Sequence, residues 1–162
     1  MDFERAWFWL EGFRISGTIR ESMWVFPVIE TLHVVTLAMT VGSIAILDLR
    51  LLGIGFDRRP VRHAAAEALP WTWLAFVATC ASGFLMFASA ASYYVTIPAF
   101  RYKALCLLLA GINMLVFHFG SWRDLGSWHD TARIPVAAKT AAALSLLFWA
   151  GVVVFGRWTG FY

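Results

Sequence analysis

Four long apolar runs, separated by short segments that carry most of the charges, dominate the hydrophobic pattern of this chain. They cover residues 25–47, 71–94, 104–119 and 136–155. A hydrocarbon layer about 30 Å thick takes roughly 20 residues of helix to cross, so each run approximates one crossing, and the third is the shortest. Backbone amides in lipid need partners within their own segment, so all four runs are predicted to be helices. The predicted fold is all-α, a single four-helix transmembrane bundle that takes up residues 1–162.

Proline positions support these limits. Pro70 and Pro135 stand at the starts of the second and fourth runs, and Pro27 stands in the first turn of the first run. At a helix start the missing N–H of proline costs nothing, because that N–H has no partner inside the helix. Pro98 lies between the second and third runs, where it is expected to interrupt the helix.

The first residues follow a different pattern from the four runs. Apolar side chains recur at helical spacing over residues 3–16, and charged residues lie off this stripe. The stripe comprises Phe3, Trp7, Leu10 and Phe13. This pattern predicts an amphipathic helix that lies in the membrane interface, with Gly17 ending it.

Composition agrees with a membrane protein. Apolar residues make up 60% of the chain and charged residues 14%, whereas a typical soluble domain has roughly half and a quarter. A chain of 162 residues has too little interior to bury so much apolar surface, so lipid must cover the rest. The net charge of +3 comes from residues between the runs rather than from a basic stripe. Contact with lipid headgroups is therefore expected, and nucleic-acid binding is not.

An even number of spans puts both chain ends on one side of the membrane, which we name side A; side B is the opposite side. Arginines are dense from Arg50 to Arg62, at the short loop that follows the first span on side B. Positive residues in short loops favour the cytoplasm. Side B is therefore predicted to be cytoplasmic and the two termini periplasmic.

Polar side chains inside a span are costly, so each one needs a reason. Glu30 and His33 are three residues apart, hence on one face of the first span, close to side A. A carboxylate and an imidazole at this spacing can bind one metal ion, or the carboxylate can hydrogen-bond the imidazole. His33 can also serve as an axial haem ligand, and the pair can bind a quinone headgroup. The alternative without a ligand is a buried hydrogen bond that ties the helix to its neighbours.

His118, at the side-B end of the third span, is the second candidate for a cofactor ligand. His33 lies about 8 residues from side A and His118 about 15, which at about 1.5 Å per residue places them on the order of 10 Å apart in depth. Axial ligands of one haem lie at nearly equal depth, because they bind opposite faces of one ring. We therefore expect a haem or metal on His33 to take its other ligand from Met86, Glu30, water or a partner chain.

Two further polar residues inside the runs are expected to hold helices together. Asp48 is expected to form an ion pair with a basic residue of another helix, such as Lys139 or Arg62. Asn113, in mid-membrane, is expected to hydrogen-bond across helices. Its predicted partners are Thr36, Thr40 and Ser145.

Three stretches of the chain are distinctive. They are RESMWVFPVIETLHVVTLAMTVGSIAILDLRLLG, from Arg20 to Gly53, then LPWTWLAFVATCASGFLMFAS, and GINMLVFH. Together they resemble an uncharacterised family of bacterial four-helix inner-membrane proteins, a domain of unknown function. The resemblance covers nearly the whole chain and implies a multi-pass protein of the bacterial inner membrane. A looser architectural likeness, to membrane b-type cytochromes and copper-resistance membrane domains, rests on histidines in a small four-span bundle.

These observations lead to a functional hypothesis. The protein is expected to be a membrane-embedded redox or electron-transfer component that binds b-type haem near the periplasmic side through His33, with Glu30 in support and His118 second. Quinone and copper are the other candidate cofactors. The chain is not expected to be an enzyme by itself, although it can be a subunit of a membrane oxidoreductase. The alternative is a cofactor-free accessory or anchoring subunit of a larger membrane complex. Either role implies contact with the lipid bilayer and with a partner membrane subunit or a second copy of the chain.

Overall fold

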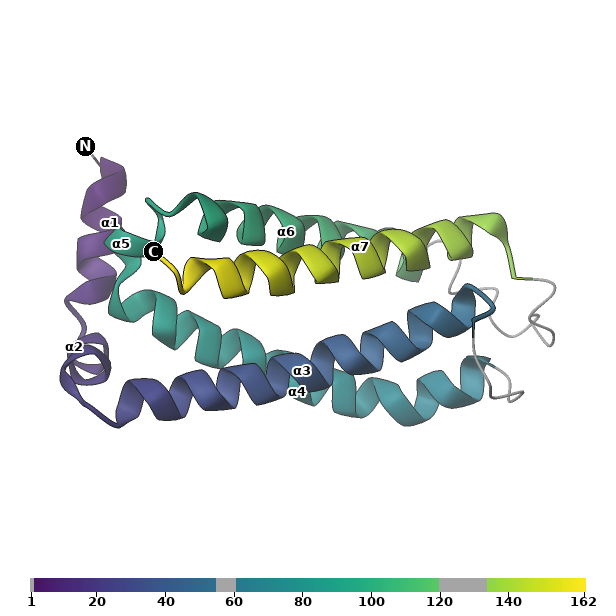
Figure 1. Ribbon diagram of the computed structural model, residues 1–162, viewed down its shortest axis with the longest axis horizontal. Helices are drawn as coiled ribbons and strands as arrows, with labels where there is room; N and C mark the ends of the chain where they lie inside the picture. The colour runs from purple at the N-terminus through teal and green to yellow at the C-terminus, as the bar shows by residue number, and fades with distance from the viewer. Residues whose placement is uncertain (1, 55–60, 120–133) are drawn as a thin grey trace.

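The computed structural model describes residues 2–54, 61–119 and 134–162, and these residues form seven helices (Figure 1). The three short helices are α1, Asp2–Glu11; α2, Arg14–Glu21; and α5, Ala91–Tyr94. The four long helices are α3, Val25–Leu51; α4, Val61–Ser89; α6, Pro98–Phe119; and α7, Val136–Thr159. Each of these four, α4 with its residues 66–89, is long and apolar enough to cross a membrane. The predicted all-α fold with four spans is therefore confirmed.

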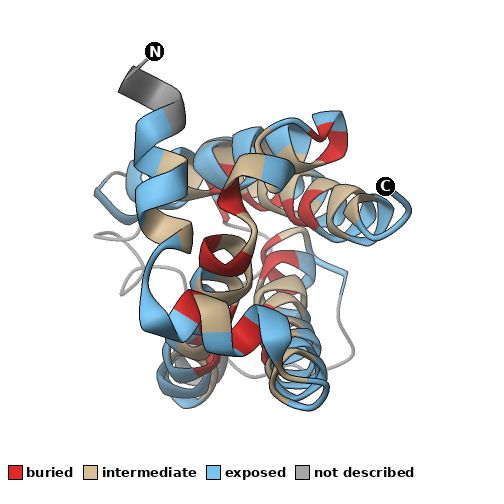
Figure 2. Ribbon diagram, turned by 90° about the vertical axis from the view of Figure 1, so that its left-hand side faces the viewer, coloured by how far each residue is buried: buried red, intermediate tan, exposed pale blue. Residues whose placement is uncertain are grey.

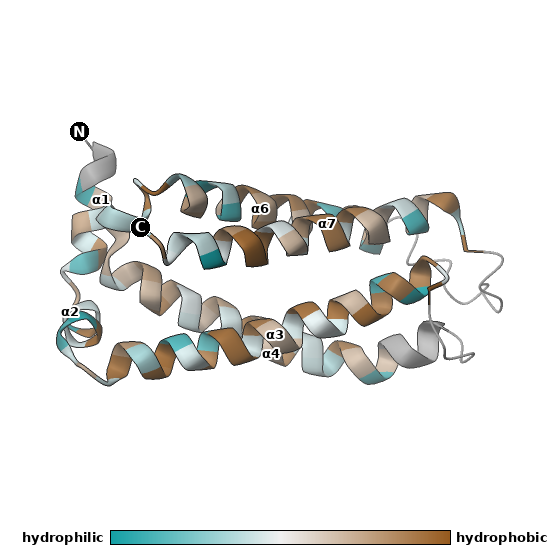
Figure 3. Cartoon of the chain, in the orientation of Figure 1, coloured by the Kyte–Doolittle hydropathy of each residue, from teal (hydrophilic) through white to brown (hydrophobic). Residues whose placement is uncertain are grey.

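The surfaces of the four long helices are suited to lipid. In the apolar window of α6 only 6% of the residues are buried inside the protein, and in that of α4, the most enclosed of the four, 33% are buried. Figure 3 shows hydrophobic residues, in brown, along all four long helices. Exposed apolar surface of this extent marks a membrane interface, because a soluble protein rarely leaves large apolar patches in water.

The spans form two antiparallel hairpins, α3 with α4 and α6 with α7, and α3 also contacts α7. Both chain ends lie at one end of the bundle, on the left in Figure 1, which is side A. A cluster at side B joins α3 to the start of α7; its buried side chains are Leu51, Ile134, Ala138 and Ala142. A second cluster joins the hairpins in mid-membrane; its buried side chains are Ala110, Trp149 and Val152. Towards side A, α3 and α7 diverge (Figure 1).

The helices α1 and α2, which we name the cap, lie across the side-A end of the bundle (Figures 1 and 2). Their main contacts are with α3, α4 and α5. The Glu11 carboxylate accepts hydrogen bonds from the backbone N–H and the hydroxyl of Ser92, both at 2.7 Å. Arg20 donates a hydrogen bond to the carbonyl of Ser89, the last residue of α4, at 3.4 Å. These bonds tie the cap to segments that are distant in sequence.

The cap differs from the single helix predicted for residues 3–16. The helix α1 ends before Gly12, and Phe13 has an extended backbone with φ −67° and ψ 140°. The chain then continues as α2 through Gly17, so the prediction that Gly17 ends the helix was wrong. The turn allows α2 to bury Ile19 where it contacts α4, which a straight continuation of α1 would not do.

The helices extend beyond the apolar runs that predicted them. The helix α4 begins at Val61, so Pro70 lies inside it and not at its start. The run predicted as 71–94 is divided at Ala90, whose backbone leaves helical geometry between α4 and α5. Pro98 itself opens α6, in the first helical position that proline favours. The apolar pattern did not predict these limits, because the polar first turn of a helix lies outside the hydrocarbon layer and is therefore not part of an apolar run.

Candidate functional site

His33 lies at the contact between α3 and α4. Its Nδ1 atom is 3.1 Å from the carbonyl oxygen of Thr79 and 3.1 Å from the hydroxyl oxygen of Ser82. A carbonyl oxygen can only accept a hydrogen bond, so the proton of the neutral ring is on Nδ1. The Nε2 atom then carries a lone pair. Protein histidines bind metal ions in this arrangement, because the bond at Nδ1 orients the ring and raises its basicity.

Gly83 makes room for the His33 ring against α4. A Cβ atom at Gly83 would lie 2.9 Å from Cε1 of the ring and 3.3 Å from Nδ1, closer than side-chain atoms normally pack. The absence of a side chain at this position therefore lets the imidazole approach the backbone of α4. Small residues at helix contacts are expected in membranes, but sequence alone did not pair this glycine with His33.

Threonine hydroxyls continue this polar contact one helical turn further into the membrane. The Oγ1 atoms of Thr36 and Thr79 are 3.0 Å apart, and both side chains are buried. Each hydroxyl is also 2.8 Å from a carbonyl oxygen of its own helix. The contact between α3 and α4 thus combines one imidazole with three hydroxyl groups, which fixes the register of the two helices.

Lys103 of α6 faces this site from the other hairpin. The side chain is half-buried, and its charge interacts electrostatically with His33. A Cβ atom at Gly156 of α7 would be 3.4 Å from its Cδ, and its ammonium lies 5.2 Å from the centre of the Phe100 ring. The third apolar run begins just after Lys103, so the proximity of Lys103 to His33 was not predicted. The earlier start of α6 brings this cation into the helix and towards His33.

Glu30 lies on α3, three residues nearer side A than His33, and its side chain is exposed. Its carboxylate acts electrostatically on both His33 and Tyr94 of α5. Burial raises the pKa of the Tyr94 phenol above its ordinary value, and the nearby Glu30 carboxylate and Tyr93 raise it further. Among the hydrogen bonds of the described residues, none joins Glu30 to His33. Glu30 therefore contributes charge to the site rather than orientation of the ring.

Met86 is half-buried on α4, four residues beyond Ser82. Residues four apart lie on one face of a helix, so Met86 is one turn nearer side A than the hydroxyl beside the His33 ring. Its thioether therefore lies on the same face of α4 as Ser82, which contacts His33.

His118 lies far from this group, near the side-B end of α6. It is exposed, and its ring meets that of Phe119 edge-on at 5.7 Å. His118 is 15 residues beyond Lys103, which is about 22 Å of helix at 1.5 Å per residue. This separation along α6 supports the prediction that His33 and His118 do not bind the same haem.

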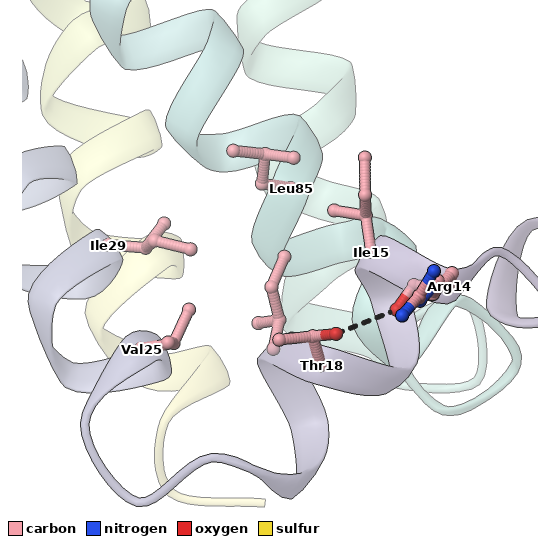
Figure 4. Close-up of a pocket in the computed structure, with 7 residues that line it drawn as sticks. Arg14, Ile15, Thr18, Val25, Ile29 and Leu85 are labelled. Atoms are coloured by element: carbon pink, nitrogen blue, oxygen red, sulfur yellow. Dashed lines mark hydrogen bonds between the residues drawn. The ribbon is translucent and has the colours of Figure 1, made fainter.

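A pocket of about 400 Å³ opens between the cap and the α3–α4 hairpin (Figure 4). Its walls are mainly apolar side chains of α2, α3 and α4, and Arg14 is its charged residue. Ile29, in this wall, is four residues before His33, and Leu85 is three residues beyond Ser82. The pocket therefore lies about one helical turn from the His33 ring.

The described residues contain no group of three or more His, Cys, Asp and Glu side chains placed to bind a metal ion. Cys80 is exposed and Cys106 half-buried, and both are free thiols. A metal ion bound by Glu30 and His33 would need water or a partner chain to complete its coordination.

Asn113 joins α6 to α7, as expected for an amide in mid-membrane. Its Nδ2 donates a hydrogen bond to the backbone carbonyl of Ala141 at 2.9 Å. The predicted partners of Asn113 were wrong, because α6 pairs with α7 and not with α3, and on α7 the accepting group is a backbone carbonyl rather than a hydroxyl. The predicted partners were Thr36, Thr40 and Ser145.

Comparison with known proteins identifies the family but no function. Residues 17–162 match a family of unknown function, DUF6644. No curated protein and no solved structure matches the chain. The matched region contains all four spans and the His33 site. The resemblance to an uncharacterised family is thus confirmed, and the chain belongs to the DUF6644 family.

Proposed function

We propose that this protein is a membrane-embedded redox component that binds b-type haem near side A through Nε2 of His33. The observation that carries the proposal is the fixed imidazole. The Thr79 carbonyl and the Ser82 hydroxyl hold Nδ1, which leaves the lone pair of Nε2 for iron. Gly83 adds to the fit, because it lets the ring settle against α4 before any ligand binds.

The cation beside His33 suits a haem, whose propionates are anionic. Lys103 supplies a half-buried ammonium from the facing hairpin, within electrostatic range of His33. Met86 supplies a thioether on the same side of α4 as Ser82, and Met is a known axial ligand of b- and c-type centres. A bound haem would supply one-electron chemistry. The chain itself orients the ring and covers the side-A end with its cap, and Lys103 would neutralise a propionate.

The pocket beside the cap is the proposed binding site for an electron-transfer partner. A quinone has an apolar tail that lies in lipid and a ring that takes hydrogen bonds at the interface. The apolar walls suit the tail, and Arg14 of the pocket suits the carbonyl groups of the ring. Because this pocket is about one turn from His33, a quinone held by its walls would lie beside a haem on His33 and would supply a partner for one-electron exchange.

Absorption spectroscopy of the detergent-purified protein tests this proposal. We expect a Soret band that shifts on reduction, and its complete loss in His33→Ala. His118→Ala is the matched control, because it removes the other imidazole of a span, and it should leave the spectrum unchanged. A colourless wild-type protein from haem-supplied cells would reject haem binding. Equal loss of a bis-histidine spectrum in both variants would contradict the separation of the two histidines.

Side A is proposed to face the periplasm of a bacterial inner membrane. The support is the density of arginines from Arg50 to Arg62 on side B, because positive residues in short loops favour the cytoplasm. Reporter fusions after Tyr162 and at Asp57, between α3 and α4, should report opposite compartments, the first periplasmic. Reporters in the same compartment would contradict the four-span topology.

A second candidate function is that of a cofactor-free accessory subunit in a larger membrane complex. The observation that favours it is Glu30, an exposed carboxylate on a span, because a charge on such a surface needs a partner. In that case His33→Ala would change no spectrum, while Glu30→Gln would reduce the size of the complex on a native gel. An unchanged complex in Glu30→Gln, together with a haem spectrum, would reject this alternative.

A further inference from the structure

Asp48 is a buried carboxylate at the opposite end of α3 from the His33 site. It is 15 residues beyond His33, which is about 22 Å of helix at 1.5 Å per residue. Only 8% of its surface is exposed, although aspartate is almost never fully buried without a partner. Neither the proposed haem site nor the pocket beside the cap uses it.

Among the described residues, the side-chain group that acts on this carboxylate belongs to another helix. It is the hydroxyl of Ser145, on α7. The oxygen Oδ2 of Asp48 is also buried, and it has no hydrogen-bond partner in the part of the chain that the structure describes. Buried polar atoms without a partner are rare in folded proteins, so this oxygen needs an explanation.

The basic side chains of Arg50 and Lys139 do not face Asp48. Arg50 is two residues further along α3, hence on a different face of the helix. Lys139 of α7 is six residues before Ser145, which also places it on a different face of α7. Among the described residues no charged group acts on Asp48, so the predicted ion pair with Lys139 is not present.

The other elements beside Asp48 offer no described cation either. The titratable residue of α4 nearest side B with a described side chain is Glu67, and that of α6 is His118; both are exposed. The side chain of Arg62, the other predicted partner of Asp48, lies outside those that the structure describes. Within the part of the chain that the structure describes, the Ser145 hydroxyl is thus the polar side-chain group that acts on Asp48.

The energetics of this environment favour a protonated carboxyl group. An ionised carboxylate in an apolar medium needs several donors or a cation, and the described residues supply one hydroxyl, that of Ser145. A neutral carboxylic acid costs far less to bury. We propose that Asp48 is a proton-binding site within the membrane, separate from the haem site, in which the carboxylate takes up one proton to become a carboxylic acid.

A proton fits this site better than a metal ion. Calcium takes six to eight oxygen ligands, and magnesium takes an octahedral set. Around Asp48 the described oxygen donors are its own carboxylate and the Ser145 hydroxyl. A proton needs a single oxygen, and the unpartnered Oδ2 supplies it.

The position of Asp48 links proton binding to the contact between the hairpins. Asp48 and Ser145 are each three residues from a member of the side-B cluster, Leu51 and Ala142. Release of the proton leaves a charge between α3 and α7, where apolar side chains join the two hairpins. Proton uptake at Asp48 therefore stabilises this contact, and proton release weakens it.

Labelling with dicyclohexylcarbodiimide tests the proposal, because this apolar reagent adds to protonated carboxyl groups inside membranes. At about pH 6 an ordinary carboxyl group, with a pKa near 4, is ionised and reacts poorly. We expect mass spectrometry of the purified full chain to find the adduct on the Asp48 peptide, several-fold above the Glu67 peptide. Asp48→Asn, which conserves shape, should abolish this label, and Glu67→Gln should not.

Infrared spectroscopy provides a second measurement that needs no reagent to enter the site. At the same pH the wild type should show the carbonyl band of a protonated carboxyl group, and Asp48→Asn should lack it. Equal labelling of Asp48 and Glu67 together with no band difference would overturn the proposal. Protection of Asp48 from the label by sodium ions would also overturn it, because it would indicate a cation site.

Discussion

The two hairpins of the bundle differ in the interactions that hold their own two helices together. Between α3 and α4, His33 contacts the Thr79 carbonyl and the Ser82 hydroxyl. Between α6 and α7, close packing against glycine dominates, and the Cys106 sulfur lies where a Cβ atom at Gly151 would be 2.7 Å away. Close packing of small residues is enough to hold membrane helices together. The polar groups between α3 and α4 therefore need a further purpose, which the proposed haem site supplies.

The cap reinforces the contrast between the hairpins. Its main contacts are with α3, α4 and α5, so it covers the side-A end of the polar hairpin. The pocket beside the cap belongs to the same hairpin. A site that must exclude water and admit a lipid-soluble partner benefits from such a cover, whereas a hairpin with a purely structural role does not need one.

The largest expected effect comes from detaching the cap. Glu11→Ala removes both hydrogen bonds to Ser92, and hydrogen bonds to a charged group contribute roughly 1.5–3 kcal/mol. We expect faster hydrogen exchange in α1 and α5, and unchanged exchange in α6 and α7. Glu21→Ala, which removes an exposed carboxylate from the same cap, is the control and should leave exchange in α5 unchanged. Equal acceleration in both hairpins would show that the cap stabilises the whole bundle.

Substitution of alanine for glycine in each hairpin, at Gly83 and at Gly151, allows a direct comparison of their packing. Overpacking costs roughly 1–3 kcal/mol, and we expect Gly83→Ala to lower the thermal stability in detergent more than Gly151→Ala. Two hydrogen bonds hold the His33 ring in place, whereas the Cys106 thiol can rotate away. Gly83→Ala should also weaken haem retention, and Gly151→Ala should not. A larger loss of stability in Gly151→Ala would reverse the comparison.

The smallest expected effect concerns the polar bonds that only tie helices. Thr79→Val removes the hydroxyl beside Thr36, and Asn113→Leu removes the amide bond to Ala141. Such bonds average about 0.6 kcal/mol in membrane proteins, so each variant should lower the unfolding free energy by about that amount. The haem spectrum should persist in Thr79→Val, because the carbonyl that holds His33 belongs to the backbone. Loss of the spectrum would show that the hydroxyl, and not the carbonyl, orients the ring.

Some features of this protein follow from local sequence. The number of spans does, because hydrocarbon accepts only continuous apolar helices of sufficient length. The singling out of Glu30 and His33 does as well, because the cost of a polar group in lipid depends on that group and not on the fold. Helix ends were harder to predict from the sequence, because a polar first turn resembles a loop. The early start of α4 at Val61 shows this.

Other features came only from the tertiary structure, and they are the ones that define the site. His33 and Thr79 are 46 residues apart, and Glu11 and Ser92 are 81 apart. Which helices pair, and which faces they present, depends on the packing of such distant segments against one another. Local periodicity records the face of a helix but not its neighbour. For that reason the tautomer of His33, the proximity of Lys103 and the burial of Asp48 beside Ser145 had no signal in the sequence, although the residues themselves were visible there.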